Sequence, residues 1–137
     1  VLESTYGDRL HAHRPTQEKR LVERVQQCLD AGGHVLFPTF ALGRAQEVLI
    51  ILAEAMRRGE LRNATIYGDG MVRSVSKVYN KFPEDLSPTA RKRWEEGIDP
   101  VFPEDLSIYR VRNNDERERI ARGGPAVVVS SSGMLQG

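Results

Sequence analysis

Short apolar runs alternate with amphipathic helical patterns along the chain, and this alternation limits the fold more than any other feature of the sequence. The runs typical of buried strands are residues 1–2, 34–40, 65–67, 106–111 and 126–130. Helical patterns lie between them, starting at Gln17, after Arg44, at Met71, after Ser87 and after Asn113 or Asn114. Such alternation is typical of a parallel sheet covered by helices. The predicted fold class is therefore α/β, a parallel-rich sheet with helices on both faces.

Local signals set the limits of these predicted elements. Thr16 is predicted to cap the first helix, and Ser87 followed by Pro88 is typical of a helix start. Gly43 is predicted to form a tight strand-to-helix turn. The stretch 81–105 contains four prolines, and we expect it to be a mobile cover.

Composition excludes several classes of function. The formal net charge is +1, so a nucleic-acid partner would have to meet a local cluster of charge. No apolar run approaches the ~20 residues of a membrane span, so no membrane partner is expected. Cys28 is the single cysteine, which excludes an internal disulfide and fits a reducing compartment, so a cytoplasmic location is predicted. Because motif-rich stretches begin directly at Val1 and stop at Gly137, we expect a piece of a longer protein.

Ligands of parallel α/β sheets bind beyond the carboxyl ends of the strands, which directs attention to the loops that follow each predicted strand. In the first loop, Glu3 is followed by His11, His13 and Arg14. Taken alone, this mixture favours a plain solvated loop. A zinc site needs three or four ligands and these histidines have no further companions, so no complete zinc site is expected in the chain. His11 is interpreted as a hydrogen-bond or phosphate contact, and His13 as a surface residue.

Two further loops carry groups that bind anions. Arg44 begins a predicted helix, where a guanidinium and the helix N-terminus both attract phosphate, although Glu47 could instead fix Arg44 in place. Ordinary helix-start chemistry explains this loop nearly as well. Ser131, Ser132 and Gly133 follow the last predicted strand and are typical of an anion nest. Motifs for a nucleophile elbow, a P-loop or a dinucleotide are absent.

Three motifs occur in order: Glu-Ser-Thr-Tyr-Gly at 3–7, Phe-Ala-Leu-Gly-Arg-Ala-Gln-Glu at 40–47 and Ser-Ser-Gly-Met-Leu at 131–135. Together they resemble the β-CASP domain of metallo-β-lactamase-fold RNA-processing nucleases, in particular the cleavage-and-polyadenylation endonuclease branch. The resemblance spans residues 1–137, which implies one Rossmann-like β-CASP domain. It also implies that this domain is inserted into a metallo-β-lactamase fold whose flanking parts are absent. Two zinc ions would belong to those parts, and this chain would hold no metal.

The resemblance assigns roles to individual residues. Glu3 matches the family's acidic motif, which pairs with a histidine near the scissile phosphate, and is predicted to be catalytic. Arg44 matches the Gly-Arg element that faces the substrate. His11, Arg14 and the loop 131–133 are predicted to contact RNA or phosphate. The partners implied are single-stranded RNA, the metallo-β-lactamase domain of the parent protein and, as a homodimer, a second copy of the chain.

The function implied is clamping of single-stranded RNA in a zinc-dependent ribonuclease, with the isolated chain inactive. One alternative is a DNA-processing β-CASP nuclease, but that branch typically carries Asp where this chain has Glu3. Another is a non-catalytic RNA- or phosphate-binding module. A small-molecule transferase would need a nucleotide fingerprint that the sequence lacks.

Overall fold

A four-stranded parallel sheet forms the centre of the chain. The structure, a computed structural model, describes residues 12–131. In that part the strand order is β1-β4-β2-β3, and every neighbouring pair is parallel. The strands are β1 Val35–Pro38, β2 Ile66–Asp69, β3 Ile108–Arg110 and β4 Val127–Ser130. The predicted α/β fold is confirmed, and the strand expected at residues 1–2 lies outside the described residues.

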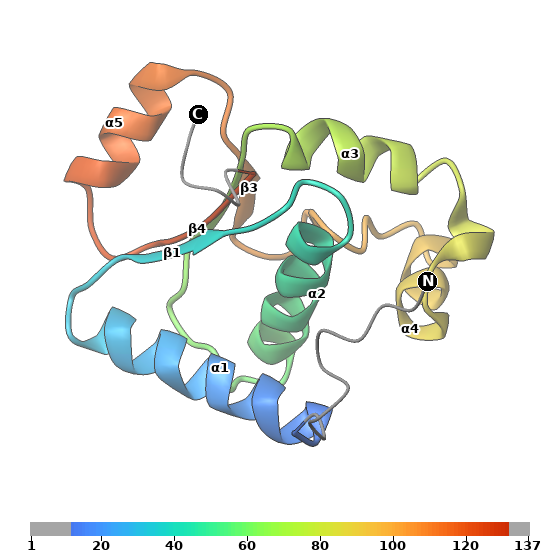
Figure 1. The fold of residues 1–137 in the computed structure, drawn as a ribbon, viewed down its shortest axis with the longest axis horizontal. Coiled ribbons are helices and arrows are strands. Elements are labelled where there is room, and N and C mark those ends of the chain that lie inside the picture. Colours follow the sequence, from blue (N-terminus) through green and yellow to red (C-terminus); the bar gives the residue numbers. More distant parts are fainter. Residues whose placement is uncertain (1–11, 132–137) are drawn as a thin grey trace, which may run out of the picture.

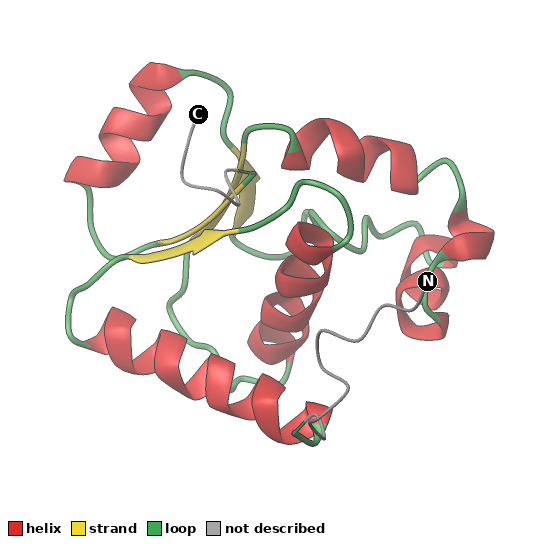
Figure 2. Ribbon diagram, viewed as in Figure 1, coloured by secondary structure: helices red, strands yellow, loops and turns green. Residues whose placement is uncertain are grey.

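Helices connect these strands and cover both faces of the sheet. Within residues 12–131 they are α1 Arg14–Asp30, α2 Arg44–Arg57, α3 Val72–Tyr79, the 3-10 helix η1 Pro83–Asp85, α4 Pro88–Glu95 and α5 Asn114–Arg122. The helices α1 and α2 lie on one side of the sheet and α5 lies on the other (Figure 1). Figure 2 shows that the strands are short and that long loops run between the helices.

The first helix begins earlier than the sequence predicts. It starts at Arg14, and Thr16, predicted as its cap, lies inside the first turn. The cap position is occupied by His13, whose side chain makes no capping hydrogen bond to the backbone. Pro15 explains the difference, because its fixed φ angle suits the first turn of a helix and its missing N–H is not needed there.

The hydrophobic core lies between the sheet and α2. Ile66 of β2 pairs in register with Val127 of β4, and both side chains are fully buried. Leu49 and Leu52 of α2 are also fully buried in this cluster. Successive strand residues point to opposite faces of a sheet. Tyr67 and Asp69 of β2 therefore lie on the α5 side, and both are only half-buried. Ile50 and Ile51, also in the apolar centre of α2, are partly buried and pack against the same cluster.

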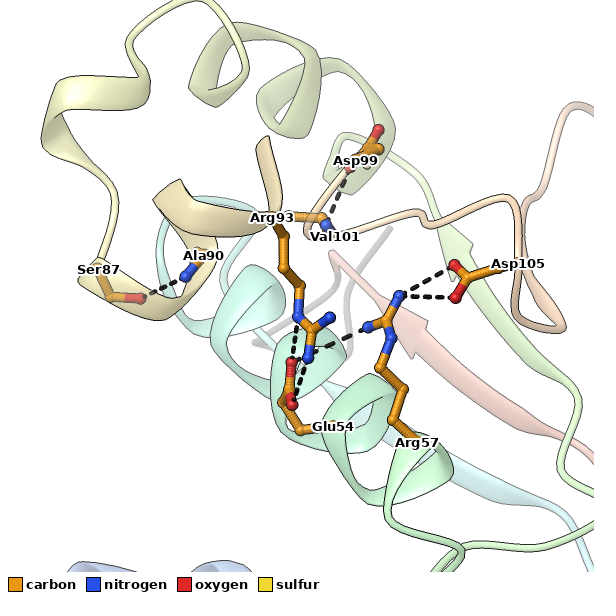
Figure 3. Close-up of polar contacts among 8 residues, drawn as sticks. All are labelled: Glu54, Arg57, Ser87, Ala90, Arg93, Asp99, Val101 and Asp105. Carbon is orange, nitrogen blue, oxygen red and sulfur yellow. Dashed lines mark hydrogen bonds and ion pairs between the residues drawn. The ribbon is translucent and has the colours of Figure 1, made fainter. Parts of the chain in front are cut away.

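The stretch 81–105, expected to be a mobile cover, is instead tied to α2 by ion pairs. Arg93 of α4 donates from Nε and Nη2 to the two carboxylate oxygens of Glu54, at 2.7 and 2.9 Å (Figure 3). Arg57 donates through Nη2 to both oxygens of Asp105, at 2.9 and 3.1 Å. Ser87 caps α4 as predicted, accepting the N–H of Ala90. Two-point pairs fix orientation as well as distance, so this stretch belongs to the packed structure.

Candidate functional site

The carboxyl ends of the parallel strands lie at one edge of the sheet, and hydrogen bonds join the loops that follow them. Thr39, after β1, donates both its N–H and its hydroxyl to the carbonyl of Ser130, at 2.9 and 3.2 Å. Met71, after β2, donates its N–H to the hydroxyl of Ser131 at 2.8 Å. The ends of β1, β2 and β4 are therefore held together, and with them two of the loops predicted to carry the chemistry, those after β1 and β4.

Gly43 adopts a backbone conformation that residues with a β-carbon rarely reach. Its φ and ψ angles are 79° and −66°, and the N–H of Arg44 donates to the carbonyl of Leu42 at 3.0 Å. This combination is a γ-turn of the rare, strained kind. The predicted tight turn at Gly43 is confirmed, and it places Arg44 at the first position of α2.

Fewer backbone N–H groups are free to bind an anion at the start of α2 than the sequence suggests. The N–H of Arg44 is engaged in the γ-turn, and the N–H of Ala45 donates to the carbonyl of Phe40 at 3.3 Å. The loop thus satisfies two N–H groups that would otherwise point outward. A phosphate at this position would be held by the guanidinium of Arg44 rather than by these two groups.

Gln46 fixes the loop before α2 against α3. Its side chain is buried, and its amide nitrogen donates to the carbonyl of Ala41 at 3.0 Å and to the hydroxyl of Ser76 at 3.2 Å. Ser76 in turn donates to the carbonyl of Val72 at 2.7 Å. Buried polar groups linked in this way hold one geometry, so the position of Arg44 rests on contacts inside the fold.

Arg14 and Arg44 share one carboxylate, that of Glu47. Nη2 of Arg14 lies 2.5 Å from one oxygen of Glu47, and Nη1 of Arg44 pairs with the other oxygen. Both arginines are about two-thirds exposed, whereas 27% of the Glu47 side chain is exposed. The structure therefore brings together two arginines that the sequence placed in different loops, and it confirms that Glu47 holds Arg44.

These residues lie in an open groove between α1 and α2. Its volume is about 710 Å³, and its charged lining consists of Arg14, Arg20, Arg24, Arg44, Glu18 and Glu47. Hydrogen bonds to Glu18 and Glu47 raise the pKa of Arg14 above its ordinary value. Four arginines against two carboxylates leave the groove positive, which suits an anionic ligand. We call it the Arg14–Arg44 groove.

Ser131 closes the turn between β2 and α3. Its hydroxyl oxygen accepts the N–H of Met71, the residue that caps α3, and lies 2.3 Å from where a β-carbon on Gly70 would be. Gly70 has a φ angle of 65°. The hydroxyl thus has a structural contact in addition to the phosphate-binding role that the sequence predicts, and its hydrogen remains able to donate.

An ion pair at the same edge, between Asp69 and Arg117, is not among the contacts predicted from the sequence. Arg117 of α5 donates through Nε to both carboxylate oxygens of Asp69, at 3.1 and 3.0 Å. The side chain of Asp69 is 13% exposed, and this contact raises the pKa of Arg117. The two residues are 48 positions apart, so no local pattern could have paired them. The pair fastens α5 to the end of β2.

The remaining predicted site residues lie outside the described residues. These are Glu3, His11, Ser132 and Gly133. Within residues 12–131, no three His, Cys, Asp or Glu side chains come together as a metal site. The same part of the chain contains no helix that is long and apolar enough to cross a membrane.

Comparison with known families decides the classification. A family model described as the Beta-Casp domain matches residues 45–137, which is more than half of the chain. The chain belongs to the β-CASP family. The part matched to the β-CASP model contains Gln46, Glu47 and Ser131, while Arg14 and Arg44 precede it.

Curated relatives extend the likeness over the whole β-CASP chain. It is 39% identical over 140 residues to transcription termination factor FttA of Methanothermobacter thermautotrophicus and 40% identical over 141 residues to that of Pyrococcus abyssi. It is 37% identical over 139 residues to an RNase J-like protein of Methanocaldococcus jannaschii. Each match covers 100% of this chain but only 22%, 21% and 31% of the respective relative. The chain thus spans roughly a fifth to a third of these relatives.

Proposed function

We propose that this β-CASP chain clamps single-stranded RNA for a zinc-dependent phosphodiester hydrolase of which it forms one domain. The observation that carries the proposal is the shared carboxylate of Glu47 between Arg14 and Arg44. A guanidinium fork binds a phosphate and a carboxylate with the same geometry, so a backbone phosphate can take the place of Glu47 between the two arginines. The names of the relatives, a transcription termination factor and an RNase J-like protein, support RNA as the polymer.

This proposal assigns a task to four residues of the chain. Arg14 and Arg44 bind and orient the phosphates, and Glu47 holds both guanidinium groups in place before RNA arrives. The task proposed for Glu3 is to help hold or move a proton at the leaving oxygen, together with a histidine from the rest of the protein. The described residues do not fit a zinc site, so the two zinc ions would be bound by a flanking metallo-β-lactamase fold.

The test uses the full-length protein and a 5′-labelled single-stranded RNA. Replacing Arg44 with Ala removes one charged hydrogen-bond donor, and we expect kcat/KM to fall by about tenfold. Replacing Glu3 with Gln keeps the size of the side chain but removes its ionisable carboxyl group, and we expect kcat to fall at unchanged KM. The matched control is Arg62→Ala, because Arg62 is exposed and lies before β2, at the other end of the strand.

Specific outcomes would overturn these assignments. Cleavage by the Glu3→Gln variant at the normal rate would remove Glu3 from the catalytic step. Equal losses for Arg44→Ala and Arg62→Ala would show that the Arg14–Arg44 groove has no special part in binding. Faster cleavage of a matched DNA oligonucleotide would favour a DNA-processing enzyme instead.

A second proposal concerns the chain on its own. The described residues form a basic groove but no metal site. We propose that the isolated 137-residue chain binds single-stranded RNA in the cytoplasm's ionic conditions but does not cleave it. Cleavage that persists in EDTA through repeated purification would contradict this second proposal.

A further inference from the structure

A second groove runs along the edge strand β3, between α3 and α5. Its volume is about 790 Å³. No residue that lines it also lines the Arg14–Arg44 groove. It therefore forms a separate surface, which we call the β3 groove.

Two tyrosines from neighbouring strands lie together in the β3 groove. Tyr67 of β2 pairs in register with Tyr109 of β3, and their ring centroids are 5.9 Å apart with the planes tilted by 38°. Tyr109 is 52% exposed, although it belongs to a strand. Single exposed apolar residues are common on protein surfaces, but adjacent aromatic rings that line a groove offer flat faces to a ligand. These faces suit a planar group.

Basic side chains surround the two rings. The groove is lined by Arg73 and Lys77 of α3, by Arg112, and by Arg119 of α5. No ion pair within residues 12–131 uses any of these four side chains. Several other arginines, among them Arg57, Arg93 and Arg117, are instead paired with carboxylates.

The fifth basic residue in the lining has a different task. Arg110 is paired with Asp99 at 2.6 Å, and its guanidinium lies 4.3 Å from the ring centroid of Phe102. It therefore supports the wall of the groove. The two acidic lining residues are Glu104 and Glu116, and Glu116 accepts the backbone N–H of Arg112 at 2.7 Å. The positive charge available to a ligand thus comes from the four side chains without ion pairs.

We infer that the β3 groove is a second binding site for single-stranded RNA, in which a base stacks on the Tyr67–Tyr109 pair and phosphates contact Arg73 and Arg119. Exposed aromatic faces beside basic side chains are the combination that binds unpaired bases and their backbone. A duplex keeps its bases stacked and would leave the rings unused. The inference extends the proposed function, because it gives RNA held at the Arg14–Arg44 groove another contact at the β3 edge of the same domain.

The first test measures binding of a 5′-fluorescein-labelled ten-nucleotide oligouridine to the 137-residue chain by fluorescence anisotropy. Tyr109→Leu removes the ring, and we expect Kd to rise by about tenfold. Tyr109→Phe keeps the ring, and we expect Kd to stay within about twofold of the wild type. Circular dichroism spectra check that both variants fold. If both variants fold and their Kd values for oligouridine are equal, the exposed ring has no part in RNA binding.

The second test uses the salt dependence of the same binding. Each phosphate contact on a single strand contributes about 0.7 to the slope of log Kd against log salt concentration. Arg73→Ala with Arg119→Ala should lower that slope by about 1.4. Arg62→Ala with Lys92→Ala is the control pair, because both residues are exposed and line neither of the two grooves.

The outcomes separate this inference from the proposed function. RNA binding that depends on Arg44 but not on Tyr109, Arg73 or Arg119 would overturn the β3 groove and leave the proposed function standing. Binding that depends on the β3 residues but not on Arg44 would support the groove and count against the clamp at Arg44. No binding of the oligouridine by the wild-type chain would overturn the inference, while cleavage by the full-length protein would still test the proposed function.

Discussion

The ring of Phe102 occupies the space that a β-carbon on Gly68 would need. An ideal β-carbon at position 68 would lie 2.5 Å from Cζ of that ring. Phe102 is 1% exposed, and its N–H donates to the carboxylate of Asp99 at 2.9 Å. The ring is therefore fixed both by burial and by the loop that carries it. A glycine inside a strand often marks such a close approach, and here it lets the segment before β3 pack on β2.

Replacing Gly68 with Ala should destabilise the fold. The new methyl group would displace a buried ring, and overpacking of this kind costs about 1–3 kcal/mol of unfolding free energy. Urea denaturation followed by circular dichroism measures the change. Gly124→Ala is the control, because Gly124 is exposed and has no atom within 4 Å of the added β-carbon. Equal stability of the two variants would show that the ring moves aside without cost.

Replacing Gly43 with Ala tests backbone strain without a steric clash. A β-carbon at Gly43 would meet nothing within 4 Å, but the φ angle of 79° would have to be kept or the turn before Arg44 would change. We expect a loss of about 1–3 kcal/mol in the free energy of unfolding. We also expect weaker RNA binding, since the γ-turn positions Arg44. Denaturation and anisotropy on the same variant measure both effects, and unchanged stability would contradict the strain.

Replacing Ser131 with Ala separates its structural contact from its predicted contact with phosphate. The change removes the acceptor of the Met71 N–H, and we expect a loss of about 1 kcal/mol in the free energy of unfolding. Ser74→Ala is the control, because Ser74 is exposed on α3 and makes no side-chain hydrogen bond within residues 12–131. Weaker RNA binding at unchanged stability would assign the hydroxyl to the phosphate instead of the turn.

The sequence predicts the elements of this fold well because their signals are local. Apolar runs bounded by glycine or charged residues mark β1, β2 and β4, and Ser87 and Asn113 cap their helices as expected. The order of strands is different, because β4 lies between β1 and β2 although it comes last in the described chain. A short apolar run does not indicate which strand it pairs with, so the strand order is known only from the folded structure.

The candidate site shows the same division between local and distant signals. The turn at Gly43 and the pairing of Arg44 with Glu47 depend on residues three positions apart or closer, and the sequence predicts a tight turn and offers the pairing as one of two alternatives. The approach of Arg14 to Glu47 and of Arg117 to Asp69 depends on how helices pack over the sheet. The neighbouring rings of Tyr67 and Tyr109 depend on strand register, which no pattern within either strand encodes.

Replacing Glu47 with Gln tests whether the shared carboxylate competes with RNA. Removing its charge leaves Arg14 and Arg44 without the anion between them, so a phosphate no longer has to displace it. An exposed ion pair is worth up to about 1 kcal/mol, so we expect Kd for oligouridine to fall by about fivefold. The stability of the fold should change by less than about 1 kcal/mol, because both arginines are largely exposed.

Glu18→Gln is the matched control for Glu47→Gln. Glu18 also accepts a hydrogen bond from Arg14, at 2.7 Å, but it makes no contact with Arg44 among the described ion pairs. We therefore expect a smaller gain in affinity than at Glu47. We also expect Kd to depend more steeply on salt concentration in Glu47→Gln than in the wild type. Glu18→Gln should not show this change, because only Glu47→Gln releases both guanidinium groups. If Glu47→Gln instead binds RNA more weakly, the carboxylate acts by holding the two arginines in the geometry that phosphate needs.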